Sequence, residues 1–455
     1  MKNYEIIDAD VVVLGGGTSG IFLALYLVSK GFRVALVEKT QKLGGALANN
    51  LVYPTAGFHT PNFKYVYSPL VDEFLRELEQ KKFSLGHIKD PLNFSSTITP
   101  LSTTSYKLLT SKLLEYNNFY FFPLSTIKQI KSKDYKIDSL FFNSYGKNYK
   151  AKGKIFVDAS GILISSYFLP IEYYFDLENT QAMSLIFKVS NVDFNLILRD
   201  LKNNPQEFYH KTDPELIKSQ KFLSVSGYFS LAKRYLNNQS LLLSRDRFLF
   251  FSYIDKNSVI VNTTRLFLKD LIKPEKILNQ DTSSIEYIEK TSYKILLKQV
   301  FYIHSIMREH IDGFKNSYIS EIADYVGIRQ YRNVKGNYTL TFEDIIKGNF
   351  FEDTISIGTW PIDIHISNSI IEKRINENGY GIPFRCCINN YKNLIFIGKN
   401  ISADRYAFSS CRIQASLMIL GENMGRILEF CLENKINPTD LDYKHIKKTV
   451  KVHLK

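Results

Sequence analysis

The sequence contains few cysteines, and their spacing excludes several kinds of site. There are four among 455 residues, all in the last quarter of the chain: Cys386, Cys387, Cys411 and Cys431. None belongs to a Cys-x-x-Cys pair, which argues against a disulfide framework and against a zinc site. A disulfide between the neighbours Cys386 and Cys387 would be strained, so we expect both to be packed as thiols. We therefore predict no metal centre and a reducing compartment.

The sequence also lacks any apolar run of the ~18 residues that a membrane-spanning helix needs. Its first residues, Met1 to Ala9, include Glu5 and Asp8 and lead into an apolar segment, unlike a signal or transit peptide. These absences predict a cytoplasmic protein without a membrane span. Hydrophobic residues make up 45% of the chain, with 33 Phe and 29 Tyr, which excludes a disordered chain.

Acidic residues are in the minority, at 45 Asp and Glu against 58 Lys and Arg, for a net charge of +13. A basic balance is compatible with a nucleic-acid or anionic-membrane partner. In this chain Lys is abundant together with Asn, Ile, Phe and Tyr, a pattern that codon bias across a genome produces. No dense basic block occurs before residues 444–455. We therefore interpret most lysines as surface residues and expect no nucleic-acid partner.

The start of the chain carries the clearest motif. Asp10 to Leu14 is an apolar run typical of a strand that is buried on both faces. Gly15, Gly17 and Gly20 follow as Gly-x-Gly-x-x-Gly, and Ile21 to Val28 has the apolar period of a helix. In a β-α-β unit these glycines make the tight turn, admit a pyrophosphate and let the helix pack on the sheet. The helix N-terminus then offers free N–H groups to the phosphates.

Glu38 indicates that the ligand is a dinucleotide. It ends a second apolar strand, Arg33 to Val37, where a carboxylate accepts the hydroxyl groups of a ribose. Gly44 and Gly45 follow, and an acid followed by such a pair is similar to the flavoproteins of the glutathione-reductase structural type. No cysteine lies near the pair, which excludes the redox disulfide of the pyridine-nucleotide disulfide reductases. No second Gly-x-Gly-x-x-Gly occurs, so no separate nicotinamide domain is visible.

Further motifs resemble the family of FAD-dependent oxidoreductases. In chain order they are 15–45, 51–59, Asp-Ala-Ser-Gly at 158–161, Gly-x-Arg-x-x-Arg at 327–332, 360–365, 380–386 and 393–402. Their order along nearly the whole chain is more specific than any single one. Two positions differ from the family pattern. Lys399 stands where the family usually has arginine, so the positive charge is kept but the two parallel hydrogen bonds of a guanidinium group are lost. Residues 162–166 stand where the family often has small and acidic residues.

The resemblance implies FAD as a non-covalent cofactor. The residues expected to bind it come from both ends of the chain: Gly15, Gly17, Thr18, Ser19, Gly20, Glu38, Lys39, Gly44, Gly45, Ala159, Gly161, Gly398, Lys399 and Arg412. A helix after Ser410 would direct its N-terminus at the pyrimidine end of the flavin, where its dipole and Arg412 favour reduction. The alternative for Arg412 is a surface ion pair.

Candidate catalytic residues lie within the same motifs: His59, Arg329, Arg332, Asp363, His365 and Arg385. A flavin enzyme needs a proton donor or acceptor beside the path of the hydride, and histidine suits neutral pH. Arginine suits a substrate carboxylate. Each also has a structural alternative, such as backbone hydrogen bonds for His59 or one buried polar face for Asp363 and His365.

We predict an α/β fold with a Rossmann-like FAD/NAD(P)-binding domain and an inserted mixed α+β substrate domain. The FAD-binding domain is expected at 1–168 and 345–443, the substrate domain at 169–344 and a basic C-terminal tail at 444–455. Strands are expected at 154–158, 183–189, 248–254, 259–264 and 394–397, and helices at 284–310 and 412–432. In the tail, Ile446, Val450 and Leu454 predict a docked helix, with an anionic-surface anchor as the alternative.

The predicted activity is that of an FAD-dependent oxidoreductase that transfers a hydride between flavin N5 and a small organic substrate. Two alternatives stay open. One is a flavin-dependent monooxygenase. The other is a flavoprotein that binds RNA or another polyanion, which the net charge of +13 suggests. The residues identify neither the substrate nor the electron donor or acceptor.

Overall fold

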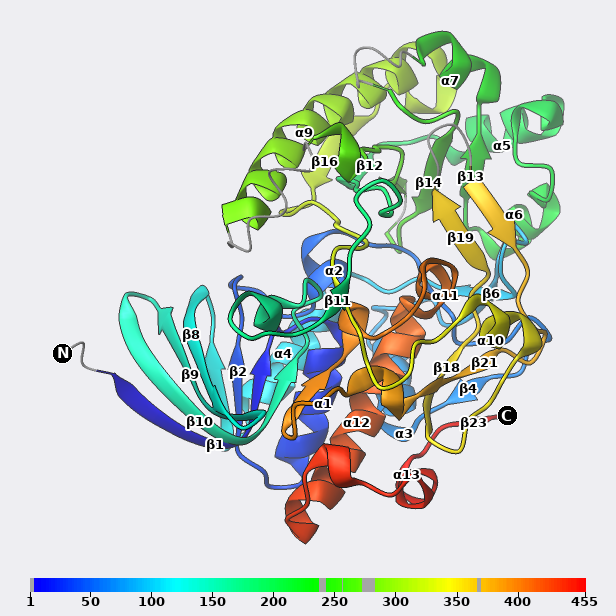
Figure 1. Ribbon diagram of the computed structural model, residues 1–455. Helices are drawn as coiled ribbons and strands as arrows, with labels where there is room; N and C mark the ends of the chain where they lie inside the picture. Colours follow the sequence, from blue (N-terminus) through cyan, green and yellow to red (C-terminus); the bar gives the residue numbers. More distant parts are fainter. Residues whose placement is uncertain (1–3, 237–242, 256, 272–282, 366–369) are drawn as a thin grey trace.

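Two sheets organise the protein in the computed structural model, which describes residues 4–236, 243–255, 257–271, 283–365 and 370–455 (Figure 1). The first sheet has seven strands in the order β7-β2-β1-β10-β9-β8, with β22 beside β10. Its strands are β1 (Glu5–Leu14), β2 (Val34–Val37), β7 (Phe119–Phe122), β8 (Ser125–Lys133), β9 (Lys136–Ser144), β10 (Lys147–Asp158) and β22 (Leu394–Phe396). The predicted α/β fold is confirmed.

Strands β7, β2, β1, β10 and β22 are parallel, so their carboxyl ends lie along one edge of the sheet. β10 pairs with β9 through residues 147–152 and with β22 through 156–158. The sequence prediction missed β8, β9 and the first half of β10. Lysines and other polar residues alternate with apolar ones there, because one face of this antiparallel part is exposed to solvent.

Two central helices, α1 (Thr18–Ser29) and α12 (Gln414–Asn434), pack against each other next to this sheet (Figure 1). Their contact is close because Gly421 faces Ser19, whose carbonyl oxygen would lie 2.3 Å from a Cβ at position 421. The predicted helix at 412–432 is wrong at its start. Arg412 and Ile413 form a corner between α11 (Arg405–Cys411) and α12.

The second sheet has five antiparallel strands in the order β13-β14-β15-β12-β16. They are β12 (Phe187–Ser190), β13 (Ser224–Gly227), β14 (Phe248–Ser252), β15 (Ser258–Val261) and β16 (Tyr318–Ile322). In the part of the chain that the structure describes, four helices accompany them: α5 (Phe194–Asn203), α6 (Pro214–Gln220), α7 (Phe229–Tyr235) and α9 (Ser283–His310) (Figure 1). The strands predicted around residues 255–257 and the helix predicted at 284–310 are confirmed, and the strand predicted at 183–189 begins only at Phe187.

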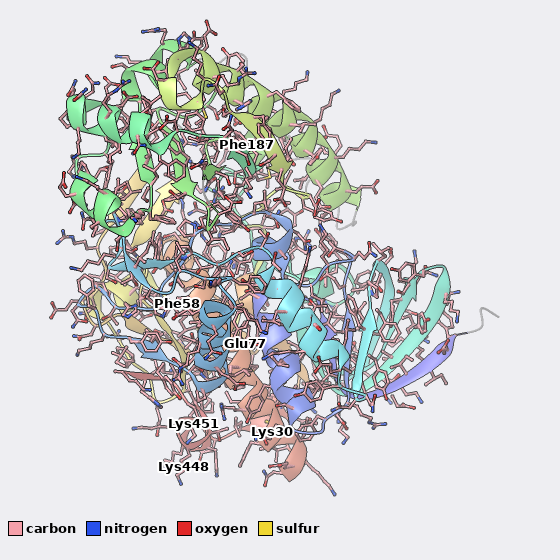
Figure 2. All side chains as sticks on the ribbon, turned by 180° about the vertical axis from the view of Figure 1, so that it is seen from behind. Lys30, Phe58, Glu77, Phe187, Lys448 and Lys451 are labelled. Atoms are coloured by element: carbon pink, nitrogen blue, oxygen red, sulfur yellow. The ribbon has the colours of Figure 1, made fainter. Side chains whose placement is uncertain are left out.

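Each sheet contributes to a core of its own. Phe58 belongs to the core that α1 and α12 share, and Phe187 to the core of the second sheet (Figure 2). Residues from elsewhere in the chain join the second core, among them Tyr53, Trp360 and Ile413. The hairpin of β19 (Ile362–His365) and β20 (Ile370–Lys373) reaches this sheet too, since Tyr209 donates a hydrogen bond to Glu372 at 2.7 Å.

Shorter elements complete the described chain: α2 (Gly45–Asn49), α3 (Pro69–Gln80), α4 (Ser105–Leu114), α10 (Phe342–Lys347), α13 (Tyr443–Thr449), β3 (Thr55–Ala56), β4 (Val66–Tyr67), β5 (Ile88–Lys89), β6 (Thr97–Thr99), β11 (Tyr173–Tyr174), β17 (Asn333–Val334), β18 (Thr354–Gly358), β21 (Tyr380–Pro383) and β23 (His453–Leu454). Of the helices in these described segments, none is both long and apolar enough to cross a membrane. All four cysteines are buried and free.

The basic tail departs from its prediction. The helix α13 buries Ile446 as expected, but it ends at Thr449 rather than continuing to Leu454. Extended backbone at Val450 turns the chain away, and β23 then pairs with β4. Lys448 and Lys451 lie at the end of the molecule opposite the second sheet (Figure 2).

Candidate cofactor and substrate site

The glycine loop after β1 leaves open backbone surface in front of α1. Gly15 has φ +102°, and a Cβ there would lie 2.7 Å from the Cα of Ser160. A Cβ at Gly20 would lie 2.3 Å from the carbonyl oxygen of Gly15. At Gly17, by contrast, the nearest atom to a Cβ is the Ala159 carbonyl oxygen at 3.9 Å. Gly15 and Gly20 are therefore required by packing, whereas Gly17 keeps free the space through which a phosphate reaches the helix.

The N-terminus of α1 receives no side-chain cap, so its first N–H groups are available to an anion. The hydroxyl groups of Thr18 and Ser19 are instead used to hold α12. Thr18 Oγ1 donates to Gln414 Oε1 at 2.6 Å, and Ser19 Oγ donates to the Leu417 carbonyl at 2.7 Å. These bonds fix the start of α12 beside the glycine loop.

Glu38 lies at the end of β2 and faces the same loop. Its carboxylate accepts hydrogen bonds from the backbone N–H groups of Gly16 at 2.7 Å and Thr40 at 2.8 Å. Each oxygen keeps a second lone pair, which suits the two hydroxyl groups of a ribose. The neighbouring Lys39 forms an ion pair with Glu289 of α9.

The Gly-Gly pair packs directly on the glycine loop. Gly44 and Gly45 have φ of +113° and +51°, a region that favours glycine. The Gly44 N–H donates to the Gly16 carbonyl at 2.8 Å. A Cβ on Gly45 would lie 2.9 Å from the Cα of Gly17, so the two segments touch backbone to backbone.

Asp158 at the end of β10 shapes the next part of the site. It is fully buried, and its carboxylate accepts hydrogen bonds from Ser160, Ser165 and Asn400. This network closes the loop that contains Ala159 and Gly161. Residues 162–166, which differ from the family pattern, thus supply Ser165 as a structural partner of Asp158.

Lys399, which follows Gly398 after β22, lies beside this loop. Its Cε would be 2.9 Å from a Cβ on Gly161, and its ammonium group donates to the Ile328 carbonyl at 2.5 Å. Burial, followed by the positive charge of Arg412, lowers the pKa of Lys399 to about 8. Lys399 is thus held in a strongly cationic environment.

These groups fit FAD. The open space at Gly17 and the uncapped helix start suit its pyrophosphate, and the Glu38 carboxylate suits its ribose. Lys399 and Arg412 then line the region beyond the ends of β10 and β22 with positive charge.

Asp363 lies close enough to several arginines to affect them electrostatically. It stands on β19, and its backbone N–H donates to Ser409 Oγ at 3.3 Å. Its negative charge raises the pKa of four arginines, which burial lowers: Arg245, Arg265, Arg329 and Arg412. Arg329 is fixed by a hydrogen bond from Nη1 to the Ala182 carbonyl at 2.5 Å. The structure thus brings together Asp363, Arg329, Arg412 and Lys399 from the expected residues.

Two other candidate arginines make contacts elsewhere. Arg332 donates to Ser166 Oγ at 3.0 Å and stacks on the rings of Tyr167 and Tyr173. Arg385 forms a bidentate pair with the buried carboxylate of Asp353. Their contacts with rings and a carboxylate hold neighbouring segments together.

His59 belongs to an aromatic group near β6. Its Nδ1 lies 2.9 Å from Thr97 Oγ1, and its ring packs edge-on against His87. Burial lowers the pKa of His59, which favours the neutral ring at pH 7. The side chain of His365 lies outside the described part of the structure. Among the described residues, no group of three His, Cys, Asp or Glu side chains is arranged to hold a metal ion.

Sequence reasoning missed Arg245 and Arg265, which are only 4% and 3% exposed. Arg245 comes shortly before β14, and Arg265 follows β15. The signal was present, because Arg265 stands between two apolar runs, 259–261 and 266–268. A charged residue between two buried strands or loops is itself buried, which is costly unless it has a partner or a function.

Comparison with known proteins identifies the family. The sequence profile described as FAD dependent oxidoreductase matches residues 10–450. The chain belongs to this family. Its cofactor is therefore FAD, and it is an oxidoreductase, in agreement with the expectation from the motifs.

Individual relatives match only in part. "Pyridine nucleotide-disulfide oxidoreductase domain-containing protein 2" of Mus musculus is 34% identical over 89 residues, 19% of this chain and 15% of that protein. Thiamine thiazole synthase of Methanococcus maripaludis is 37% identical over 73 residues, 16% of this chain and 25% of that protein. These matches span a quarter of the relatives' length or less. The p-nitrophenol 4-monooxygenase PnpA from Pseudomonas putida shares the fold, with a TM-score of 0.50 and 10% identity over 96% of this chain and 84% of that one.

Proposed function

We propose that this FAD-dependent oxidoreductase transfers a hydride between flavin N5 and a small organic substrate that lies beside Asp363. The observation that carries the proposal is electrostatic. The charge of the Asp363 carboxylate acts on Arg329 and Arg412, and the charges of these two arginines act on Lys399. A base and cations thus adjoin the region where the strand ends and the start of α12 converge.

The FAD-binding residues in this proposal are those of the glycine loop, Glu38, the Gly44-Gly45 pair, the 159–161 loop and Gly398. The division into an FAD-binding part at 1–168 and 345–443 and a substrate part at 169–344 belongs to the same proposal. Trp360 and Glu372 extend the substrate part, because both contact the second sheet or its loops.

FAD supplies a two-electron centre that accepts or returns a hydride at N5. In the oxidative direction, a substrate C–H bond breaks with its electron pair, and a proton leaves the adjacent oxygen, nitrogen or carbon for the Asp363 carboxylate. The arginines orient a substrate that carries negative charge. In the reductive direction the protonated Asp363 returns the proton.

The test is a search for substrates with the FAD-loaded protein in the absence of oxygen, read as loss of the visible flavin absorbance. We expect a substrate that bleaches the flavin in the native protein and does so about a hundredfold or more slowly in D363N, because general-base catalysis contributes about that much. D138N, which changes an exposed aspartate on β9, serves as the control. A flavin that dithionite reduces but no substrate reduces, or equal rates in D363N, would contradict the proposal.

The two alternatives make different predictions. A monooxygenase, the activity in the name of PnpA, consumes oxygen in proportion to an external nicotinamide cofactor, and a reduced enzyme that is stable in air excludes it. A polyanion-binding flavoprotein binds RNA with a steep dependence on salt, and flat binding across a salt series excludes it.

A further inference from the structure

A row of four buried or half-buried arginines runs from the corner before α12 into the second sheet. We call Arg265, Arg245, Arg329 and Arg412 the arginine row. Ser244 Oγ donates to the Arg265 carbonyl at 2.7 Å, which holds the segment of Arg245 beside that of Arg265. Arg329 donates to the Ala182 carbonyl, next to the bridge between Met183 and Leu266. The four residues come from four different segments, so the fold, not the local sequence, assembles the row.

Several guanidinium nitrogens in the row have no hydrogen-bond acceptor within the described structure. They are Nε of Arg245, Nε and Nη2 of Arg265 and Nε of Arg412. Arg245 and Arg265 are nevertheless held by other hydrogen bonds. Arg245 Nη1 donates to the Asn262 carbonyl at 2.7 Å, and the backbone of Arg265 is held by two hydrogen bonds to the side chain of Gln299. Buried donors that are positioned but unused are expected where a ligand brings the acceptors.

The carboxylates near the row do not balance its charge. The cations that affect one another electrostatically are Arg245, Arg247, Arg265, Arg329, Lys399, Arg412 and Lys39. The carboxylates that act on them are Asp246, Asp270, Asp363 and Glu289. Asp246 is further occupied by a bidentate pair with Arg247 at 3.0 Å. A buried excess of positive charge is costly unless an anion enters.

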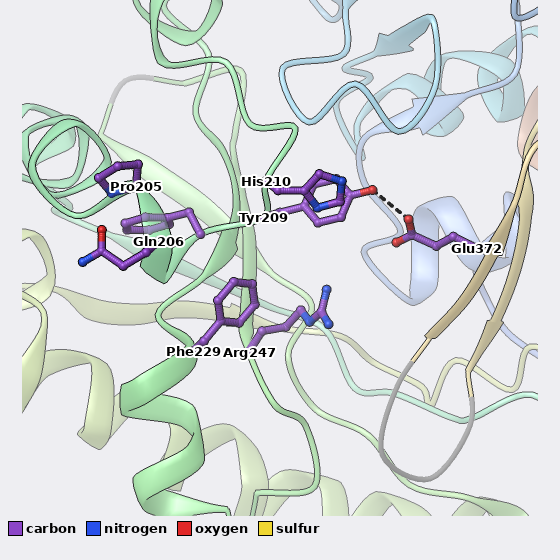
Figure 3. A pocket seen from close by; sticks show the side chains of 8 residues that line it. Pro205, Gln206, Tyr209, His210, Phe229, Arg247 and Glu372 are labelled. Carbon is purple, nitrogen blue, oxygen red and sulfur yellow. Dashed lines mark hydrogen bonds between the residues drawn. The ribbon is translucent and has the colours of Figure 1, made fainter.

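An open groove lies beside Arg247. It has a volume of about 560 Å³ and is lined by Tyr209, His210, Phe229, Arg247 and Glu372, among others (Figure 3). Arg247 belongs both to this groove and to the charges that lower the pKa of Arg245 and Arg265. A small anion that enters the groove therefore meets Arg247.

We propose that the arginine row binds the substrate as a small organic dicarboxylate, with one carboxylate at Arg245 and Arg265 and the other at Arg329 and Arg412. An extended row of guanidinium groups matches two separated carboxylates better than a single anionic group, because each carboxylate accepts a bidentate pair of hydrogen bonds. This inference rests on the proposed function, since it places the carbon chain between the two carboxylates beside Asp363.

Equilibrium binding to the FAD-loaded, oxidised protein tests the inference without turnover. The probes are malonate, succinate and glutarate, with acetate and propionate as monocarboxylates and with inorganic phosphate and sulfate, all at constant ionic strength. Binding is followed by the change in the flavin absorption spectrum and by calorimetry. We expect saturable binding of at least one dicarboxylate, about tenfold or more tighter than either monocarboxylate and than phosphate or sulfate.

Two variants locate the site. R265Q and R245Q each remove one charge of the row, and we expect each to weaken dicarboxylate binding about tenfold or more while FAD still binds. R234Q removes an exposed arginine of α7 and leaves the binding unchanged. Thermal melting and the flavin spectrum of each variant report whether it is folded.

Three outcomes would overturn the inference. One is the absence of dicarboxylate binding to the native protein, which decides the matter even when a variant fails to fold. A second is equal affinity for phosphate or sulfate, which would show a general anion site. The third is unchanged dicarboxylate binding in folded R265Q and R245Q. If dicarboxylates bind as expected but no substrate reduces the flavin, the proposed function fails and the anion site stands.

Discussion

The side chain of Lys399 lies across Gly161, with its Cε 2.9 Å from the position of a Cβ at residue 161. Its ammonium group donates to the Ile328 carbonyl at 2.5 Å. Burial and the nearby charges of Arg412, Lys39 and Arg329 hold the pKa of Lys399 at about 8, below the ordinary 10.5. The folded protein therefore releases this proton more readily than the unfolded chain does.

This relationship predicts how the stability of the FAD-free protein depends on pH. Below about pH 8 Lys399 is protonated in both states, and its buried charge destabilises the fold. Between about pH 8 and 10.5 the unfolded chain keeps the proton that the folded protein has lost, so this residue makes the free energy of unfolding rise with pH. K399M is expected to be more stable than the native protein at neutral pH and to lose that rise.

Urea denaturation at about pH 7 and about pH 10 measures both effects. K152M, which changes an exposed lysine of β10, is the matched control. If K399M and K152M had the same stability at both pH values, the environment assigned to Lys399 would be wrong.

Substitutions at Gly17 and Gly15 are expected to have different effects, the first on FAD binding and the second on stability. A Cβ in G17A meets nothing nearer than 3.9 Å, so the FAD-free variant should melt like the native protein, while its FAD affinity falls about tenfold or more because the methyl group stands where the phosphate approaches. G15A should lose about 1–3 kcal/mol of stability, since its φ is +102° and its Cβ meets backbone at 2.7 Å. Thermal melting and fluorescence titration with FAD compare the two. Tight FAD binding by G17A would contradict the assignment.

The contact between α1 and α12 predicts a second pair of outcomes. A Cβ at Gly421 would lie 2.3 Å from the backbone carbonyl of Ser19, whereas a Cβ at Gly425 would lie 2.8 Å from the ring of Tyr26. A side chain can shift, but a carbonyl group within a helix cannot do so easily. We expect G421A to cost about 1–3 kcal/mol or more and G425A to cost less, as measured by urea denaturation. The reverse order would show that the helices do not cross as described.

Arg332 should matter for stability and not for the anion site. Its guanidinium carbon lies 4.1 Å from the centre of the Tyr167 ring and 4.3 Å from that of Tyr173. R332K loses the planar stacking and should be less stable by about 1–3 kcal/mol, while the folded variant binds dicarboxylates as the native protein does. Thermal melting measures the loss of stability, and calorimetric titration measures dicarboxylate binding. A stable R332K that no longer binds dicarboxylates would place Arg332 in the substrate site.

The sequence was most informative where function constrains the backbone. The spacing of Gly15, Gly17 and Gly20 after an apolar run predicted β1 and α1, because only one local structure uses all three glycines. The corner at Arg412 was not predicted, because no proline or glycine near Arg412 and Ile413 marks a break between two helices. It depends on the packing of α12 against α1, which involves residues almost 400 positions apart.

The arginine row also could be predicted only in part from the sequence. Arg329 and Arg412 were found because they belong to motifs that resemble the family. Arg245 and Arg265 belong to no such motif, and only the pairing of β14 with β15 brings them together. The positions of Arg332 and Arg385 likewise depend on tertiary contacts, with tyrosine rings and with Asp353, that spacing along the chain does not reveal.

The visible absorption spectrum of the purified protein, followed by identification of the cofactor released on denaturation, tests the FAD site most directly. We expect the two bands of an oxidised flavin and the release of intact FAD into solution. A colourless protein that takes up no FAD would contradict this assignment, because the Gly15–Gly20 loop would then serve another nucleotide. A flavin that stays attached to the denatured chain would contradict the non-covalent site.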